Sequence, residues 1–237
     1  MKAHRGAAVI AALCLLLIIL TGHRIERAYA HWRVMSQTYG MSISSGDWAD
    51  IYYTDQDKDY APLIRRLTDY YLPLILKDFN AQNRGRAVIV IFPSAARFTA
   101  AVGRLDNLPM GAYYGGVINI ISPSLWMANA HNASAKDYFI QNGPLIHEFT
   151  HYAADKGPQK QLPPWLAEGV ALYYEYKYTG TEWRPDLEPE AARISLANLE
   201  KNFRALDERA AYRKAFDVVR DYVRKYGEDR LRRLIDR

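Results

Sequence analysis

All segments with strand-like patterning lie before residue 123, and this order constrains the fold most strongly. ADIYYT at 49–54 is typical of a strand, and the β-branched run AVIVIF at 87–92 predicts a buried central strand. AYYGGVINIIS at 112–122 predicts one strand, or two that break at Gly115-Gly116. Early strands followed by late helices predict an α+β protein, with a small mixed β-sheet lobe packed on a helical lobe.

The remaining segments show helical spacing. Apolar residues recur with a helical period over 59–79, where Pro62 suits the first turn and Pro73 predicts a kink or a split. Ser94 is expected to cap a helix over 95–104. Further helices are expected over 135–141, 144–156, 164–178, 188–205, 207–226 and 228–236.

The N-terminus carries an export signal. Lys2 and Arg5 precede the apolar run GAAVIAALCLLLIILTG at 6–22, whose length suits either a signal-peptide core or a short membrane span. AYA at 28–30 offers a cleavage site after Ala30, but the charged stretch HRIER before it favours an uncleaved membrane anchor. We therefore expect an extracytoplasmic, membrane-anchored protein, with secretion after cleavage as the alternative. The purely structural alternative is that residues 6–22 form a buried core helix.

The length and composition suit a single exported domain. The 237 residues suffice for one well-packed domain, which we place at 47–237. The polar stretch before it is expected to be a linker, at 31–46, or else a ragged edge of the domain. Of the net charge of +5, residues 1–30 hold +3. The remainder is nearly balanced and predicts no nucleic-acid partner. Cys14 is the only cysteine and lies in the apolar run, so disulfides and thiolate metal sites are excluded from the exported part.

The segment HEFTH at 147–151 predicts a metal site. The Asn142-Gly143-Pro144 stretch signals a helix start, so His147 and His151 project from the same helix face one turn apart. Two imidazoles so placed bind one zinc ion, and Glu148 is adjacent without being a ligand. A zinc ion lowers the pKa of its water toward neutrality, and a carboxylate beside it is suited to act as general base.

A catalytic zinc site needs a third protein ligand and an open position. Pro163-Pro164 marks the start of the next helix, and Glu168 lies about one turn inside it. If the two helices pack antiparallel, His151 and Glu168 face each other at the same height. This arrangement predicts one Zn²⁺ per chain, held by His147, His151 and Glu168.

Other residues compete for the third ligand position. Asp155 lies one turn beyond His151, but three ligands along one helix do not converge on a point. Glu175 is better placed to orient a ligand imidazole or to lie at the surface. His131 lies in a polar loop and is expected to be solvated. The alternative to a metal site is a purely structural amphipathic helical pair that happens to contain histidine.

Three segments carry a resemblance to a known family. HEFTH at 147–151, LPPWLAEGVALYYE at 162–175 and YGEDRLRRLI at 226–235 resemble the gluzincin metallopeptidases, specifically the peptidase MA-like family. The resemblance covers roughly residues 85–237. It implies a thermolysin-like zincin core, with ligands His147, His151 and Glu168 and with Glu148 as base.

The resemblance has departures and extensions. The loop between the two motifs is slightly shorter than in thermolysin. Leu172 stands where thermolysin carries an aspartate, so the residue that orients a metal ligand is left unassigned. By analogy, Tyr212 is the candidate that stabilises the oxyanion, with an ordinary helix-face tyrosine as the alternative. The strand at 115–121 is a candidate for pairing with the substrate backbone, or else a buried strand.

Together these features predict a zinc-dependent peptidase that hydrolyses peptide bonds outside the cytoplasm, with peptide or protein substrates and a membrane contact through residues 6–22. We expect an endopeptidase, because no signature that binds a free amino terminus is evident. One alternative is a catalytically silent binding or scaffold module, against which the intact Glu148 argues. Another is a zinc hydrolase of a non-peptide amide. The sequence leaves the oligomeric state open.

Overall fold

Five strands form one mixed sheet in the computed structural model, which describes residues 22, 24–81, 85–103, 107–127, 135–157 and 162–235. The spatial order is β1-β2-β3-β5-β4. β2, β3 and β5 run parallel, and β1 and β4 are antiparallel edge strands. The predicted α+β fold with a mixed sheet is therefore confirmed. The strands are β1 (Ser42–Ser45), β2 (Ala49–Tyr53), β3 (Ala87–Phe92), β4 (Gly111–Tyr114) and β5 (Val117–Ile121).

Alternating side chains of the central strand β3 build two cores. Ile89 and Ile91 pack in the main core, with residues of α2 (Ala61–Asp78) and α6 (Leu145–Lys156). Val90 and Phe92 face the opposite side of the sheet, where α3 (Ala95–Val102) covers them. A strand that is apolar on both faces fits this burial, because helices cover both sides of the sheet.

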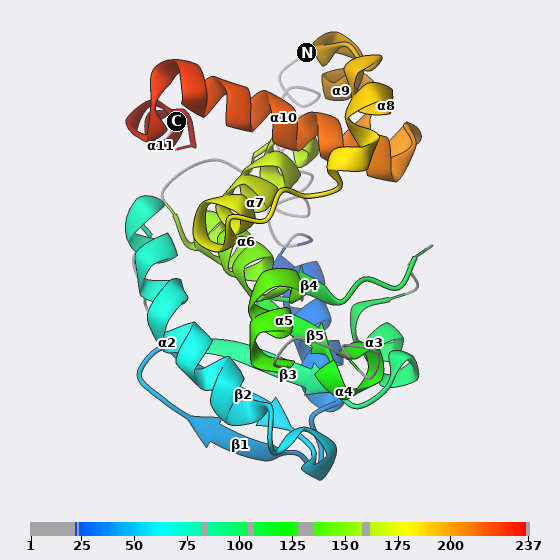
Figure 1. Cartoon of the computed structure of the whole chain (residues 1–237). Coiled ribbons are helices and arrows are strands. Elements are labelled where there is room, and N and C mark those ends of the chain that lie inside the picture. Colours follow the sequence, from blue (N-terminus) through cyan, green and yellow to red (C-terminus); the bar gives the residue numbers. More distant parts are fainter. Residues whose placement is uncertain are drawn as a thin grey trace, which may run out of the picture.

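Further helices build the second lobe. In Figure 1, α7 lies between α6 and α10. α8 and α9 lie near one end of α10 and α11 lies at its other end, all on the side of the molecule remote from the sheet. The bounds of these and the short elements are α4 (Pro123–Trp126), α5 (Ala135–Asn142), α7 (Pro164–Thr179), α8 (Glu188–Ala192), α9 (Leu196–Asn202), α10 (Glu208–Tyr226), α11 (Glu228–Ile235), and 3₁₀ turns η1 (Asp55–Asp57), η3 (Pro185–Leu187) and η4 (Phe203–Ala205).

The segment predicted as a linker, 31–46, is part of the fold. Residues 24–36 are helical, and Val34 is fully buried in the core behind the sheet. The short strand β1 then pairs antiparallel with β2. Its sequence SISS lacks apolar alternation, as is common for an exposed edge strand. The segment therefore fits the edge of the domain better than a linker.

The local predictions have mixed outcomes. Pro73 lies inside one continuous helix, α2, so the helix does not split there. The helix expected over 188–205 is interrupted, because the Ser195 hydroxyl accepts a hydrogen bond from the Asn198 N–H (3.2 Å) and starts α9 anew. Gly115 and Gly116 both have positive φ and form the tight turn between β4 and β5, so two strands are present. The cap by Ser94 is confirmed.

Residues 1–21, which contain nearly all of the predicted anchor, lie outside the described residues. In the part that is described, no helix combines the length and apolarity needed to cross a membrane.

Candidate metal centre

The start of α6 determines which side chains share a face. Pro144 precedes the first helical residue, Leu145. The residue before Pro144 must be a glycine, Gly143, because a Cβ there would lie 2.4 Å from the Phe139 carbonyl oxygen. The helix therefore begins at a defined residue, and His147 and the residue one turn later point toward α7.

Three predicted ligands converge between α6 and α7. The Nε2 atom of His147 lies 3.1 Å from Glu168 Oε2, and the Nε2 atom of His151 lies 3.5 Å from the same oxygen. Their candidate ligand atoms all lie within 4.8 Å of one another. The predicted approach of His151 and Glu168 across two packed helices is thus present. The set offers two imidazole nitrogens and one carboxylate oxygen.

The spacing of these atoms fits a small tetrahedral ion. Ligand bonds of about 2.0–2.1 Å in a tetrahedral zinc site separate ligand atoms by about 3.4 Å. The two N–O separations, 3.1 and 3.5 Å, bracket that value, and all three candidate ligand atoms lie within 4.8 Å of one another. If these three side chains bind a tetrahedral ion, one position is left for water or substrate, as in catalytic rather than structural zinc sites.

Glu175 lies two turns after Glu168 on α7 and contacts His147 at the ring nitrogen that does not face Glu168. Its Oε1 lies 3.3 Å from the Nδ1 atom of His147. A carboxylate at this nitrogen fixes the tautomer that leaves Nε2 free to bind a metal, and it makes the imidazole more basic. Leu172 offers no such carboxylate, and Glu175, about one turn farther along the helix, provides one for the His147 ring.

The protonation behaviour of the cluster follows from these contacts. Burial would lower the pKa of His147, but the hydrogen bonds and charges of Glu168 and Glu175 raise it well above its usual range. Burial would raise the pKa of Glu168, but hydrogen bonds from both histidines hold it far below its usual range. Glu168 therefore remains an anionic ligand at any pH near neutrality.

Glu148 lies beside the cluster, on the side of α6 that faces the edge strand β4. Its side chain is almost fully buried, at 4% exposed, and burial raises its pKa. Positive charge on the two histidines and a hydrogen bond from the Tyr113 backbone oppose that rise. The strand approaches this closely because Gly111 has no side chain. A Cβ there would lie 3.0 Å from Glu148 Oε1 and 2.7 Å from the Pro144 Cβ.

Asp155, the competing ligand, is engaged elsewhere. Its carboxylate accepts two hydrogen bonds from the Arg27 guanidinium, at 2.9 and 2.8 Å, and one from the Tyr113 hydroxyl at 2.7 Å. It is not part of the cluster of candidate ligands. Asp155 therefore fastens the helix at 24–36 and strand β4 to α6.

Tyr212 extends from α10 toward the cluster. Burial raises the pKa of its phenol, as do the negative charges of Glu168, Glu208 and Glu148 and a hydrogen bond to Glu168. Its ring stacks on Phe203, with centroids 5.6 Å apart. The phenol is therefore a neutral hydrogen-bond donor next to a candidate metal ligand.

Gly169, next to the ligand Glu168, allows α10 to approach α7. A Cβ at this position would lie 2.5 Å from the Ala215 carbonyl oxygen and 3.0 Å from a Val219 methyl group. The sequence therefore places a glycine where the helix that carries Tyr212 packs closely against the helix that carries the ligand. Residue type alone did not indicate this role.

Two further sequence expectations have different outcomes. His131 lies outside the described residues. The segment at 115–121, considered for substrate pairing, forms the hairpin turn and β5, which is enclosed between β3 and β4. The alternative, a buried strand, is therefore confirmed for β5, and β4 is the edge strand beside Glu148.

Comparisons with known proteins leave the function to be argued from this geometry. No family model matches the chain. The chain is similar to the uncharacterized protein YhcO of Bacillus subtilis (strain 168), with 22% identity over 214 residues. The match covers 84% of this chain and 63% of YhcO, so the chain spans less than two thirds of that relative's length.

Proposed function

We propose that this protein is a zinc-dependent peptidase with a thermolysin-like catalytic core. The observation that carries the proposal is the convergence of His147, His151 and Glu168, with the buried Glu148 beside the cluster and outside it. Burying a carboxylate is costly, and a purely structural helix pair would have no need for one at the position of Glu148.

The donor set fits zinc by chemistry and spacing, and each ligand has a defined role. His147 and His151 would bind through Nε2, and Glu168 would bind through one carboxylate oxygen. Zinc held there would polarise the scissile carbonyl and lower the pKa of a bound water. Glu175 holds the His147 ring in the orientation and tautomer that this binding requires.

Glu148 is the general base in this proposal. It would take a proton from the attacking water at a carboxylate oxygen and would pass that proton to the leaving amine. Its buried environment raises its pKa, and a weakly acidic carboxyl group is a better proton acceptor. The Tyr113 backbone N–H fixes the position of the carboxylate from the strand side.

Tyr212 and β4 complete the proposed machinery. The Tyr212 hydroxyl would donate a hydrogen bond to the oxyanion that develops on the attacked carbonyl. β4 pairs only with β5 among the described strands, so the part of its other edge that does not bind Glu148 through the Tyr113 N–H is available to the backbone of an extended peptide. An edge strand next to Glu148 favours a peptide over a small non-peptide amide as substrate, and an internal peptide bond over a terminal one.

The surroundings of the site bear on the alternatives. A catalytically silent scaffold remains the second candidate, but it does not account for a buried Glu148. We further propose, from the sequence of residues 1–22, that the site works outside the cytoplasm and that this segment holds the chain at the membrane.

The variant Glu148→Gln tests the proposal on the full chain. Gln keeps the side-chain shape and removes the proton acceptor, so peptide hydrolysis should fall by a factor on the order of 10²–10⁴. Zinc stoichiometry and melting temperature should stay near those of the wild type, as they should in the exposed control Glu200→Gln. Equal turnover by Glu148→Gln and wild type would remove Glu148 from the mechanism. No turnover of any library peptide by the zinc-loaded wild type would favour the scaffold.

A further inference from the structure

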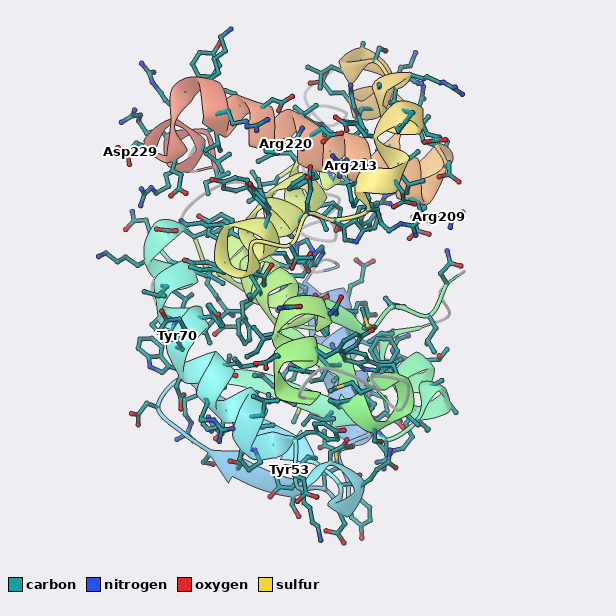
Figure 2. The ribbon with its side chains drawn as sticks, in the orientation of Figure 1. Tyr53, Tyr70, Arg209, Arg213, Arg220 and Asp229 are labelled. Atoms are coloured by element: carbon teal, nitrogen blue, oxygen red, sulfur yellow. The ribbon has the colours of Figure 1, made fainter. Side chains whose placement is uncertain are left out.

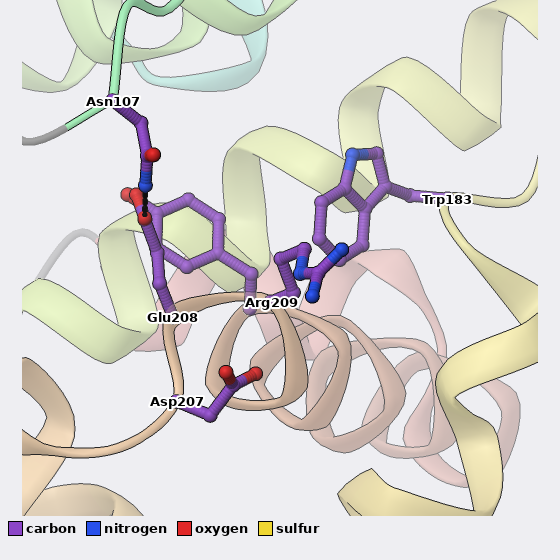
Figure 3. Close-up of a pocket in the computed structure, with 6 residues that line it drawn as sticks. Asn107, Trp183, Asp207, Glu208 and Arg209 are labelled. Carbon is purple, nitrogen blue, oxygen red and sulfur yellow. Dashed lines mark hydrogen bonds between the residues drawn. The ribbon is translucent and has the colours of Figure 1, made fainter.

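A pocket of about 500 Å³ opens beside the candidate metal centre. Figure 3 shows it at the start of α10, between that helix, the segment around Trp183 and the segment that contains Asn107. It is lined by Asn107, Trp183, Asp207, Glu208, Arg209 and Tyr212. No step of the proposed hydrolysis uses this pocket except through Tyr212.

Tyr212 connects the pocket with the metal centre. The same side chain lines the pocket and forms a hydrogen bond to the ligand Glu168. A peptide bond held for attack at the cluster would therefore have a neighbouring side chain within reach of the pocket. The pocket is placed to select substrates.

One wall of the pocket is aromatic and rigid. The rings of Trp183 and Tyr212 lie with centroids 6.1 Å apart. Behind them, Arg213 donates hydrogen bonds to the Trp183 carbonyl oxygen and to Glu182, both at 2.8 Å. Arg213, labelled on α10 in Figure 2, has a side chain only 1% exposed. This buried anchor holds the backbone at Trp183 in place.

The opposite wall has an excess of negative charge. Glu208 accepts a hydrogen bond from the neutral Asn107 amide (2.6 Å), and Asp207 accepts one from the Ala210 backbone N–H (2.9 Å). Neither bond neutralises the carboxylate. Among the lining residues that the structure describes, Arg209 is the one cation, so two carboxylates outnumber it.

We propose that this pocket binds a lysine or arginine side chain of the peptide substrate, close to the bond that is cleaved. The long alkyl stem would pack along Trp183 and Tyr212, and the cationic head would lie between these rings and Glu208. Substrates with an acidic residue at this place would be disfavoured by the same carboxylates. This inference rests on the proposed peptidase function.

Cleavage of a peptide library by the zinc-loaded full chain provides the first test. Mass spectrometry of the products should show enrichment of lysine and arginine at one position near the cleaved bond. A wild-type chain that cleaves with no basic preference at any position would overturn the pocket assignment and leave the peptidase proposal intact. Absence of all cleavage would instead defeat the peptidase proposal, as described above.

Paired charge variants then assign the preference to this pocket. With two peptides that differ only by lysine or leucine at the preferred position, Glu208→Gln should lower the lysine-to-leucine ratio of kcat/KM about fivefold, the scale of an exposed charge pair. Arg209→Gln should leave that ratio unchanged or raise it. The opposite pattern, in which Arg209→Gln alone abolishes a preference, would show that the pocket binds an acidic group.

A binding measurement separates recognition from hydrolysis. In the Glu148→Gln background, calorimetric titration should show tighter binding of the lysine peptide than of the leucine peptide. Addition of Trp183→Ala should weaken lysine-peptide binding while zinc content stays constant. If Trp183→Ala destabilises the fold, Trp183→Phe keeps an aromatic wall and should retain most of the difference. Equal binding of both peptides in the Glu148→Gln background would contradict the inference.

Discussion

The two sides of α6 are built in different ways. The side that faces α7 carries His147 and His151, and their partners Glu168 and Glu175 follow within the same 29-residue stretch, 147–175. The side that faces β4 carries Glu148 and Asp155, whose partners lie in segments far away in the chain. The metal side is thus local in sequence, and the base side is assembled by the tertiary fold.

This difference matters for how each side responds to substitution. On the α7 side, side chains are the interacting groups, so residue type determines the metal affinity. On the β4 side, the Tyr113 backbone N–H donates a hydrogen bond to Glu148. The strand can approach this closely because Gly111 has no side chain. The first side should fail through loss of metal. The second should fail through loss of geometry while the metal stays bound.

Removal of Glu168 should have the largest effect on the α7 side. Glu168→Ala removes the anionic member of the proposed ligand set, and zinc affinity should fall by about 100-fold or more, beyond the usual effect of changing a residue that only orients a ligand. Asp155→Ala should retain zinc, because its carboxylate binds Arg27 and Tyr113 instead. Competition with a chromophoric chelator measures both. Retention of zinc by Glu168→Ala together with its loss from Asp155→Ala would reverse the ligand assignment.

Glu175 should have the next largest effect, also on zinc. Glu175→Ala leaves the Nδ1 atom of His147 without its carboxylate partner, and zinc affinity should fall by about 10–100-fold. Glu175→Gln should restore part of this loss, since an amide oxygen still accepts a hydrogen bond. The exposed Glu200→Ala is the matched control in the same chelator assay. Equal affinity of Glu175→Ala and Glu200→Ala would show that Glu175 does not orient the histidine.

The same contrast explains what was predictable from the sequence. His147, His151 and Glu168 were predictable because helical periodicity places them on facing surfaces of two consecutive helices. The buried strand β3 was predictable from its β-branched run. These signals are local, and they survive whatever the tertiary structure is.

Features that depend on distant segments were not predictable. The polar strand β1 shows no pattern of its own and exists because β2 offers a partner. The roles of Gly111 and Gly169 appear only when another element packs at 2.5–3.0 Å from the missing Cβ. The pocket wall at Trp183 depends on Arg213, which lies 30 residues later.

Gly111→Ala tests the base side directly. A methyl group would collide with Pro144 and with Glu148, so β4 must shift away from α6. The free energy of unfolding in urea should fall by about 1–3 kcal/mol, the usual cost of overpacking. Hydrolysis should fall further than this loss of folded protein explains, while zinc affinity of the folded chain stays unchanged. A fall in zinc affinity that matches the fall in activity would erase the distinction between the two sides.

The smallest effect is expected at Arg27, which joins the helix at 24–36 to the base side. The Arg27 side chain is 55% exposed, so its ion pair with Asp155 should contribute only about 0.2–1 kcal/mol and should weaken with added salt. Asp155→Ala should destabilise the fold more, because it also leaves the Tyr113 hydroxyl without its acceptor. Urea unfolding of both variants and of the double variant, at low and high salt, measures the coupling between the two residues. A larger loss for Arg27→Ala than for Asp155→Ala would mean that the N-terminal helix, rather than β4, holds the base side of α6 in place.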